Sequence, residues 1–138
     1  RLAKEMRRGT AYVMYLGGGK CVLLRMRDKE KIIKNELPNI PPVVAGLDVS
    51  ILHNLVLDKL FGLTIAEQNK YGSIDYVSTI ESGMERVDAG AYQVCFFLNG
   101  TKISEVRDVA KSGAVMPQKS TDFYPKLLTG IINRRMVF

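Results

Sequence analysis

A polar cluster near the end of the chain has the residue types that bind an anion. Gln118, Lys119, Ser120 and Thr121 follow one another, and Lys126 adds a second cation shortly afterwards. Amide, hydroxyl and ammonium groups donate hydrogen bonds to phosphate oxygens, and the ammonium group also supplies charge. The cluster therefore predicts a binding site for phosphate or for a phosphorylated small molecule such as a nucleotide.

Two aromatic residues belong to the same stretch. Phe123 and Tyr124 precede Lys126, and an aromatic ring can stack on a nucleobase or close a pocket. The same residues also fit a structural loop, in which hydroxyl groups cap turns, Phe123 plugs the core, and Pro117 and Pro125 stiffen the chain. From the residues alone, both interpretations remain open.

Two further side chains are candidates for acid–base chemistry. His53 is the one histidine of the chain, and Asp48 precedes it in the same predicted helix. Histidine exchanges a proton readily near neutral pH, but no neighbour in the sequence completes a catalytic pair, so a surface or structural role is the competing interpretation. Phosphoryl transfer usually needs magnesium, and a complex of Mg²⁺ with a nucleotide is the cofactor that this hypothesis implies.

The composition indicates one soluble globular domain. The chain has 138 residues, of which 46% are hydrophobic and 25% are charged, which is enough for one core and too few for two. No apolar run approaches the roughly 18 residues that a membrane span needs. We expect a single domain over residues 1–138, in the cytoplasm and without a membrane partner. Because the chain begins with Arg1, we expect a fragment of a longer protein, with residues 1–9 as the tail of a preceding region.

The charge favours an anionic partner. The net charge is +6, which attracts phosphate, nucleotide or nucleic acid. The cations are dispersed and mixed with acids, and the helix predicted over residues 48–61 has only one, Lys59. A nucleic-acid-binding face needs clustered cations. An anionic small molecule is therefore the expected partner, and a nucleic-acid-binding module is an alternative.

The cysteines and the histidine do not suggest a metal site. Cys21 and Cys95 fall in predicted strands, and the chain has no Cys-x-x-Cys motif. Structural zinc needs four such ligands. We expect no metal site of this type, and two buried free thiols.

Strand signals occur in five segments. Gly17, Gly18 and Gly19 join two segments rich in β-formers, which is typical of a hairpin. The apolar run 94–98 is typical of a central strand that is covered on both faces. We expect strands at residues 10–16, 20–27, 73–79, 91–98 and 127–138.

Helix signals occur in three segments, each followed by a glycine. Asp48 and Thr101 can cap two of them, and Ser78 with Glu81 has the spacing of a capping box for the other. Residues 28–46 are expected to be a linker, because their prolines exclude a regular helix across the second half. We expect helices at residues 48–61, 80–89 and 102–112.

This alternation predicts an α+β fold. The expected order is β-β-α-β-α-β-α-loop-β, with a mixed sheet and three helices packed on it. The loop of this order is the stretch that carries the polar cluster, so the fold would present the cluster between the third helix and the last strand.

The polar cluster also carries a resemblance. The sequence Met-Pro-Gln-Lys-Ser-Thr at residues 116–121, and the segment 123–130 after it, resemble the signature of a bacterial and archaeal family, the domain of unknown function ten-fifteen. Asp122 and Gly100 depart from the family pattern, which has an aromatic residue and a proline there, and Asp122 changes the charge of the loop. Further segments agree, so the resemblance covers residues 10–138; they are residues 48–53, 87–90 and 96–99.

The resemblance implies a larger protein. It implies that this chain is the C-terminal part of a longer chain, whose N-terminal part is its partner. Apart from the resemblance, we expect that the protein can form a homo-oligomer. The N-terminal part of the family is distantly similar to the ParB-like superfamily, which includes nucleotide-binding DNA-partition proteins and free-serine kinases. A phosphoryl-transfer protein is thus one expectation, and a structural or assembly domain without a ligand is the alternative.

Overall fold

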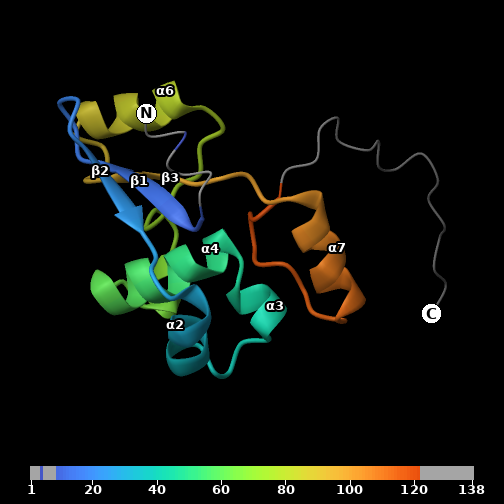
Figure 1. Ribbon diagram of the computed structural model, residues 1–138. Coiled ribbons are helices and arrows are strands. Elements are labelled where there is room, and N and C mark those ends of the chain that lie inside the picture. The colour runs from blue at the N-terminus through green and yellow to red at the C-terminus, as the bar shows by residue number, and fades with distance from the viewer. Residues whose placement is uncertain (1–3, 5–8, 122–138) are drawn as a thin grey trace, which may run out of the picture.

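The computed structural model describes residue 4 and residues 9–121, and this part has a mixed α and β fold (Figure 1). A small antiparallel sheet lies beside several helices, as the sequence predicts for the fold class. In chain order the elements are β1 (Ala11–Tyr15), β2 (Cys21–Arg25), α2 (Lys29–Glu36), α3 (Pro42–Ala45), α4 (Asp48–Ile51), the π-helix η1 (Leu52–Leu60), α5 (Ile65–Gln68), α6 (Ile80–Asp88), β3 (Cys95–Phe97) and α7 (Ile103–Lys111).

The sheet has the strand order β2-β1-β3 within the described residues. The hairpin of β1 and β2 is confirmed, since Gly17, Gly18 and Gly19 all have positive φ in the turn between them. The strand expected at residues 91–98 is the short β3, and within the described residues it pairs only with β1. The described sheet is antiparallel, and its central, most buried strand is β1, so the expected mixed sheet and the central position of residues 91–98 are not confirmed in this part of the chain.

Each face of the sheet has its own apolar cluster. Tyr12 of β1 packs with Ile51, Leu52, Val56 and Leu57 of α4 and η1. The other face carries Ala11 and Val13, together with Leu23 and Phe97, and α6 lies on the side away from η1 (Figure 1). The alternation of side chains along β1 thus holds the sheet between the two helical layers.

The helix expected at residues 48–61 is present, but most of it is a π-helix. The amide of Phe61 donates to the carbonyl of Val56, five residues back, at 3.0 Å. Asp48 does not cap it, because the N-cap is Leu47 and Asp48 lies in the first turn. Gly62, with φ of 71°, ends it as predicted.

Two other segments correct the sequence analysis. Residues 28–46 are not a plain linker, since they contain α2 and α3; Pro42 is tolerated because it stands in the first turn, where its missing N–H costs nothing. Residues 73–79 form no strand, and Ile74 packs instead against the Tyr12 cluster. α5 forms in the stretch expected to be a connection. The expected order of elements is therefore wrong in these places.

The two remaining helices are present with shifted caps. The hydroxyl of Thr79, rather than Ser78, accepts from the amide of Ser82 at the start of α6. The N-cap of α7 is Lys102 rather than Thr101. The strand expected at residues 127–138 lies outside the described residues. No helix in the described part is long and apolar enough to cross a bilayer.

Candidate functional site

The polar cluster begins with a tight turn. Both the amide and the hydroxyl of Ser120 donate to the carbonyl oxygen of Pro117, at 3.3 and 2.6 Å. The hydroxyl of Thr101 donates to the carbonyl of Ser120 at 2.7 Å, which ties the turn to the start of α7. Lys119 is exposed and has φ of 58°. The Ser120 hydroxyl is therefore engaged in its own loop, whereas the Lys119 side chain faces solvent.

The rest of the predicted site is described only in part. Thr121 is half-buried and ends the described stretch. Phe123, Tyr124 and Lys126 lie outside the described residues. The structure thus allows the cluster to be followed as far as Thr121.

A cavity joins this loop to the π-helix; its described lining has seven polar residues beside the apolar Ile40, Val44, Val49, Ile65 and Pro117, and we call it the polar cavity. Its volume is about 240 Å³, and it brings together Gln118 and His53, two predicted site residues that are far apart in the sequence. Its other polar lining comes from α4, from η1, from α5 and its C-cap, and from the irregular segment before α6. Those polar residues are Ser50, Asn54, Gln68, Asn69 and Tyr76.

Gln68 fixes the orientation of the His53 ring. The Nδ1 atom of His53 lies 2.6 Å from Oε1 of Gln68. The Nε2 atom of Gln68 donates to the carbonyls of His53 and Leu63, at 2.9 and 2.8 Å. Because these two bonds fix the amide, Oε1 faces the ring as an acceptor, so Nδ1 carries the proton. The other ring nitrogen of neutral His53 is then an acceptor.

The position of Gln68 follows from a local motif. Thr64 and Glu67 form a capping box at the start of α5: the Glu67 amide donates to the Thr64 hydroxyl at 3.3 Å, and the Thr64 amide donates to the Glu67 carboxylate at 2.9 Å. The bonds from Thr64 hold the pKa of Glu67 below its usual range. This box orients α5 so that Gln68 reaches His53.

Ser50 is the buried polar side chain that the described structure leaves unpaired. It is 3% exposed, it lines the cavity, and its Oγ atom has no hydrogen-bond partner among the described residues. A buried hydroxyl without a partner costs free energy. Because Ser50 lines the cavity, a small rotation of its side chain would bring the Oγ atom, which has almost no exposed surface in this conformation, to a ligand or a bound water.

The cavity wall coincides with the unusual part of the helix. Both His53 and Asn54 belong to η1, and a π-helix adds a residue to each turn at the expense of packing. Irregular helical turns of this kind occur often at functional sites. The distortion therefore points to the same surface as the unpaired Ser50 hydroxyl.

The described lining of this cavity holds no charged side chain. Burial raises the pKa of Tyr76, so its phenol stays neutral at physiological pH. The rings of Tyr76 and His53 are stacked, with centroids 6.5 Å apart and planes inclined at 28°. The site consequently offers flat rings, amides and a hydroxyl group, without a fixed charge.

Asp48 lies outside the lining of this cavity, and its contacts stabilise the fold. Its Oδ1 atom accepts from the Thr10 hydroxyl at 2.7 Å and lies 3.7 Å from the Lys29 ammonium. Its carbonyl oxygen accepts from the Tyr12 hydroxyl at 2.7 Å, and Asn99 donates to Oδ2 at 3.5 Å. Asp48 thereby links the sheet, α2 and α4, and the structure does not bring it together with His53 at one cavity.

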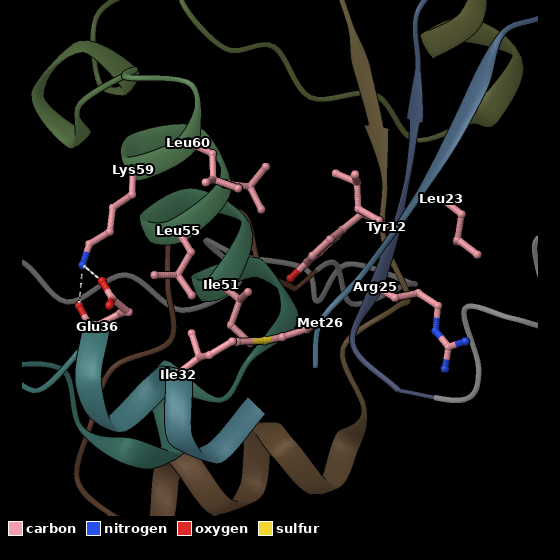
Figure 2. Close-up of a pocket in the computed structure, with 12 residues that line it drawn as sticks. Tyr12, Leu23, Arg25, Met26, Ile32, Glu36, Ile51, Leu55, Lys59 and Leu60 are labelled. Carbon is pink, nitrogen blue, oxygen red and sulfur yellow. Dashed lines mark hydrogen bonds and ion pairs between the residues drawn. The ribbon is translucent and has the colours of Figure 1, made fainter. Parts of the chain in front are cut away.

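A larger cavity of about 510 Å³ lies between β2, α2 and η1 (Figure 2). Most of its lining is apolar. The Tyr12 hydroxyl is engaged by the Asp48 carbonyl, and the Lys59 ammonium is ion-paired with Glu36. A ligand site needs a few convergent polar groups that fix orientation, and the described polar groups here are already partnered. None of the sequence-predicted site residues that the structure describes lines it.

The cysteines and acids of the described residues form no metal site, since no group of three or more metal-ligating side chains occurs there. Cys95 is half-buried and burial raises its pKa, whereas Cys21 is exposed, contrary to expectation. Both cysteines pair in register with Tyr15, on opposite sides of β1. Two strand spacings of about 4.8 Å separate them, which is too far for a disulfide.

Part of this site could have been found from the sequence. Ser50 and His53 are three residues apart in a predicted helix, so they share a face, and Thr64 with Glu67 has capping-box spacing. The contributions of Gln68 and Tyr76 have no local signal. Comparison with protein-family models, with curated proteins and with solved structures finds no match to this chain.

Proposed function

We propose that this domain binds a small molecule in the polar cavity formed by Ser50, His53 and Gln118. The observation that supports this most is the Ser50 hydroxyl, buried at the cavity wall without a partner among the described residues. A ligand that pairs with this hydroxyl removes the cost of leaving it unpaired. The π-helix at His53 supports the same surface.

The polar cluster extends this proposal to an anionic ligand. Gln118 lines the cavity and Lys119 follows it directly, so their Cα atoms lie about 3.8 Å apart. A nucleotide or another phosphorylated molecule would place its uncharged part in the cavity and its phosphate at the exposed Lys119 ammonium. The phosphate would be held by charge there, with Thr121 close by in the chain.

The larger protein is proposed from the resemblance to the domain of unknown function ten-fifteen. In that setting the domain would supply the ligand-binding part of a phosphoryl-transfer protein. The described residues contain no cluster of acids that could hold Mg²⁺. Magnesium ligands would therefore come from elsewhere in the longer protein. This domain by itself would bind its ligand without catalysing a reaction.

A structural role of the loop is the second candidate. The internal hydrogen bonds of Ser120 and the bond from Thr101 favour it, because they are the contacts that a structural turn makes. If the loop only stabilises the fold, Lys119 and Gln118 do not contact a ligand. Replacing either residue with alanine would then leave ligand binding unchanged.

A thermal-shift screen tests the proposal. The protein would be screened against nucleotides, phosphorylated metabolites and free amino acids, with Lys119→Ala and Gln118→Ala measured alongside. A ligand that stabilises the parent protein and fails to stabilise either variant supports the site, because a ligand that binds the folded state raises Tm. Lys111→Ala, on the exposed end of α7, is the matched control and keeps the full shift. If no ligand stabilises the protein and Lys119→Ala itself lowers Tm, the structural role holds instead.

A further inference from the structure

We infer that the cavity is selective for an uncharged, planar hydrogen-bonding group, such as a carboxamide or the edge of a nucleobase, over a carboxylate of the same shape. This inference rests on the proposed function and specifies its ligand. It goes beyond that proposal by assigning a hydrogen-bond direction to the site.

The direction follows from the fixed tautomer of His53. The Gln68 amide is oriented by two carbonyl acceptors, so its oxygen accepts from Nδ1 of His53. Nε2 of the neutral ring carries a lone pair and has no hydrogen-bond partner among residues 9–121. A ligand that fits this atom must donate a hydrogen bond to it. A primary amide does so, and a carboxylate cannot.

Ser50 completes the pattern. A hydroxyl group both donates and accepts, so the Oγ atom, once its side chain turns toward the cavity, can pair with either the carbonyl or the N–H of the ligand. The side-chain nitrogen of Asn54 already donates to the Ser50 carbonyl at 2.8 Å, which holds this turn in place. One acceptor at His53 and one adaptable group at Ser50 match a ligand that donates and accepts side by side.

The absence of charge explains the exclusion of a carboxylate. No charged side chain lines the described wall of the cavity, so an anion that enters loses its hydration without gaining an ion pair. The Lys119 ammonium belongs to the outer loop and is not part of this lining. The two stacked rings of His53 and Tyr76 supply flat walls, which favour a planar group.

Matched ligand pairs test the inference. Benzamide is compared with benzoate, and nicotinamide with nicotinate, at neutral pH. Binding is followed by amide chemical shifts in isotope-labelled protein, and the ring nitrogens of His53 are observed directly. We expect each amide to shift the signals of Ser50, His53 and Gln118, with a Kd at least about tenfold lower than that of its acid. We also expect the free protein to show Nδ1 protonated and Nε2 bare.

Variants separate a binding role from a structural one. His53→Phe keeps a ring and removes the acceptor, so amide binding should be lost, whereas His53→Gln restores an acceptor and should recover part of it. Ser50→Ala should weaken amide binding by about tenfold. If His53→Phe does not fold, the tautomer of His53 and the comparison of ligand pairs in the parent protein still test the inference.

The outcomes distinguish the inference from the proposed function. An acid that binds in the cavity as tightly as its amide, or a free protein with Nε2 protonated and Nδ1 bare, overturns the inference and leaves the proposed function standing. If the amides shift no signal while other library compounds shift the signals of Gln118 and His53, the inference is also overturned and the proposed function stands. If neither pair nor any library compound shifts these signals, both the inference and the proposed function fail.

Discussion

The Nδ1 atom of His53 lies 2.6 Å from the side-chain oxygen of Gln68, and this pair connects the π-helix to α5. Gln68 is almost fully buried and uses both ends of its amide. The side chain therefore holds two backbone carbonyls and one ring in a single arrangement. The wall of the cavity depends on this arrangement being intact.

Replacing Gln68 with Glu keeps its shape and removes its donors. The carbonyls of His53 and Leu63 would then face a carboxylate, so we expect Gln68→Glu to lower the free energy of unfolding by about 1–3 kcal/mol. Urea denaturation measures this. Asn69→Asp makes the same chemical change at the exposed neighbouring position and should cost less than about 0.5 kcal/mol. Equal losses in the two variants would show that the Gln68 bonds do not hold the fold.

Gly83 allows α6 to approach β3 closely. A Cβ atom there would lie 2.8 Å from Sγ of Cys95 and 3.3 Å from atoms of Phe97 and Val77. We expect Gly83→Ala to destabilise the protein by about 1–3 kcal/mol through overpacking, measured by thermal unfolding. Adding Cys95→Ala should recover part of the loss. Gly100→Ala, which meets no atom within 4 Å, is the control, and a loss as large as that of Gly83→Ala would contradict the packing account.

Tyr12 makes the free energy of unfolding depend on pH in the alkaline range. Burial and the nearby Asp48 carboxylate raise the pKa of Tyr12, so the folded protein keeps this proton at a pH where the unfolded chain releases it. The free energy of unfolding is unaffected below about pH 10 and falls above it, by up to about 1.4 kcal/mol per pH unit. Urea titrations at several pH values should show this fall, and Tyr12→Phe should reduce its slope. Tyr71→Phe, at a fully exposed position, should not, and an unchanged slope in Tyr12→Phe would refute the assignment.

Asp48 should matter for stability and not for binding. Its carboxylate accepts from Thr10 and lies near Lys29, so we expect Asp48→Ala to cost about 1–3 kcal/mol because the buried Thr10 hydroxyl loses its acceptor. A ligand of the polar cavity should bind the folded variant with unchanged Kd, measured by calorimetry. Asp108→Ala removes an exposed carboxylate of α7 and should cost well under 1 kcal/mol. Loss of binding in Asp48→Ala would restore Asp48 as a site residue.

The fold class follows from local signals, and the exact order of elements does not. The glycine hairpin and the helices at residues 48–61, 80–89 and 102–112 were recognisable because turn chemistry and apolar period agree. The prolines of residues 28–46 favour a linker, whereas α2 ends before Pro38 and α3 has Pro42 in its first turn, so neither helix is interrupted. Residues 73–79 were wrongly expected to be a strand, since β propensity does not specify a pairing partner.

The candidate site was recognisable in its parts rather than as a whole. Gln118 and His53 were singled out by residue type, and only the folded chain shows that they line one cavity. The sequence gives no signal that Gln68 or Tyr76 lines a cavity, so their contribution depends on tertiary packing. The π-helix has no sequence signature either, because the apolar residues of segment 48–61 are spaced as in an ordinary amphipathic helix.

The most direct test of the proposed site is chemical-shift mapping of the labelled protein against the ligand library. The account predicts that a binding compound shifts the amide signals of His53 and Gln118 together, and that its Kd rises in Gln118→Ala. Shifts confined to Leu24 and Leu55, which line the larger cavity of Figure 2, or unchanged binding in Gln118→Ala, would contradict the central claim that the polar cavity is the ligand site.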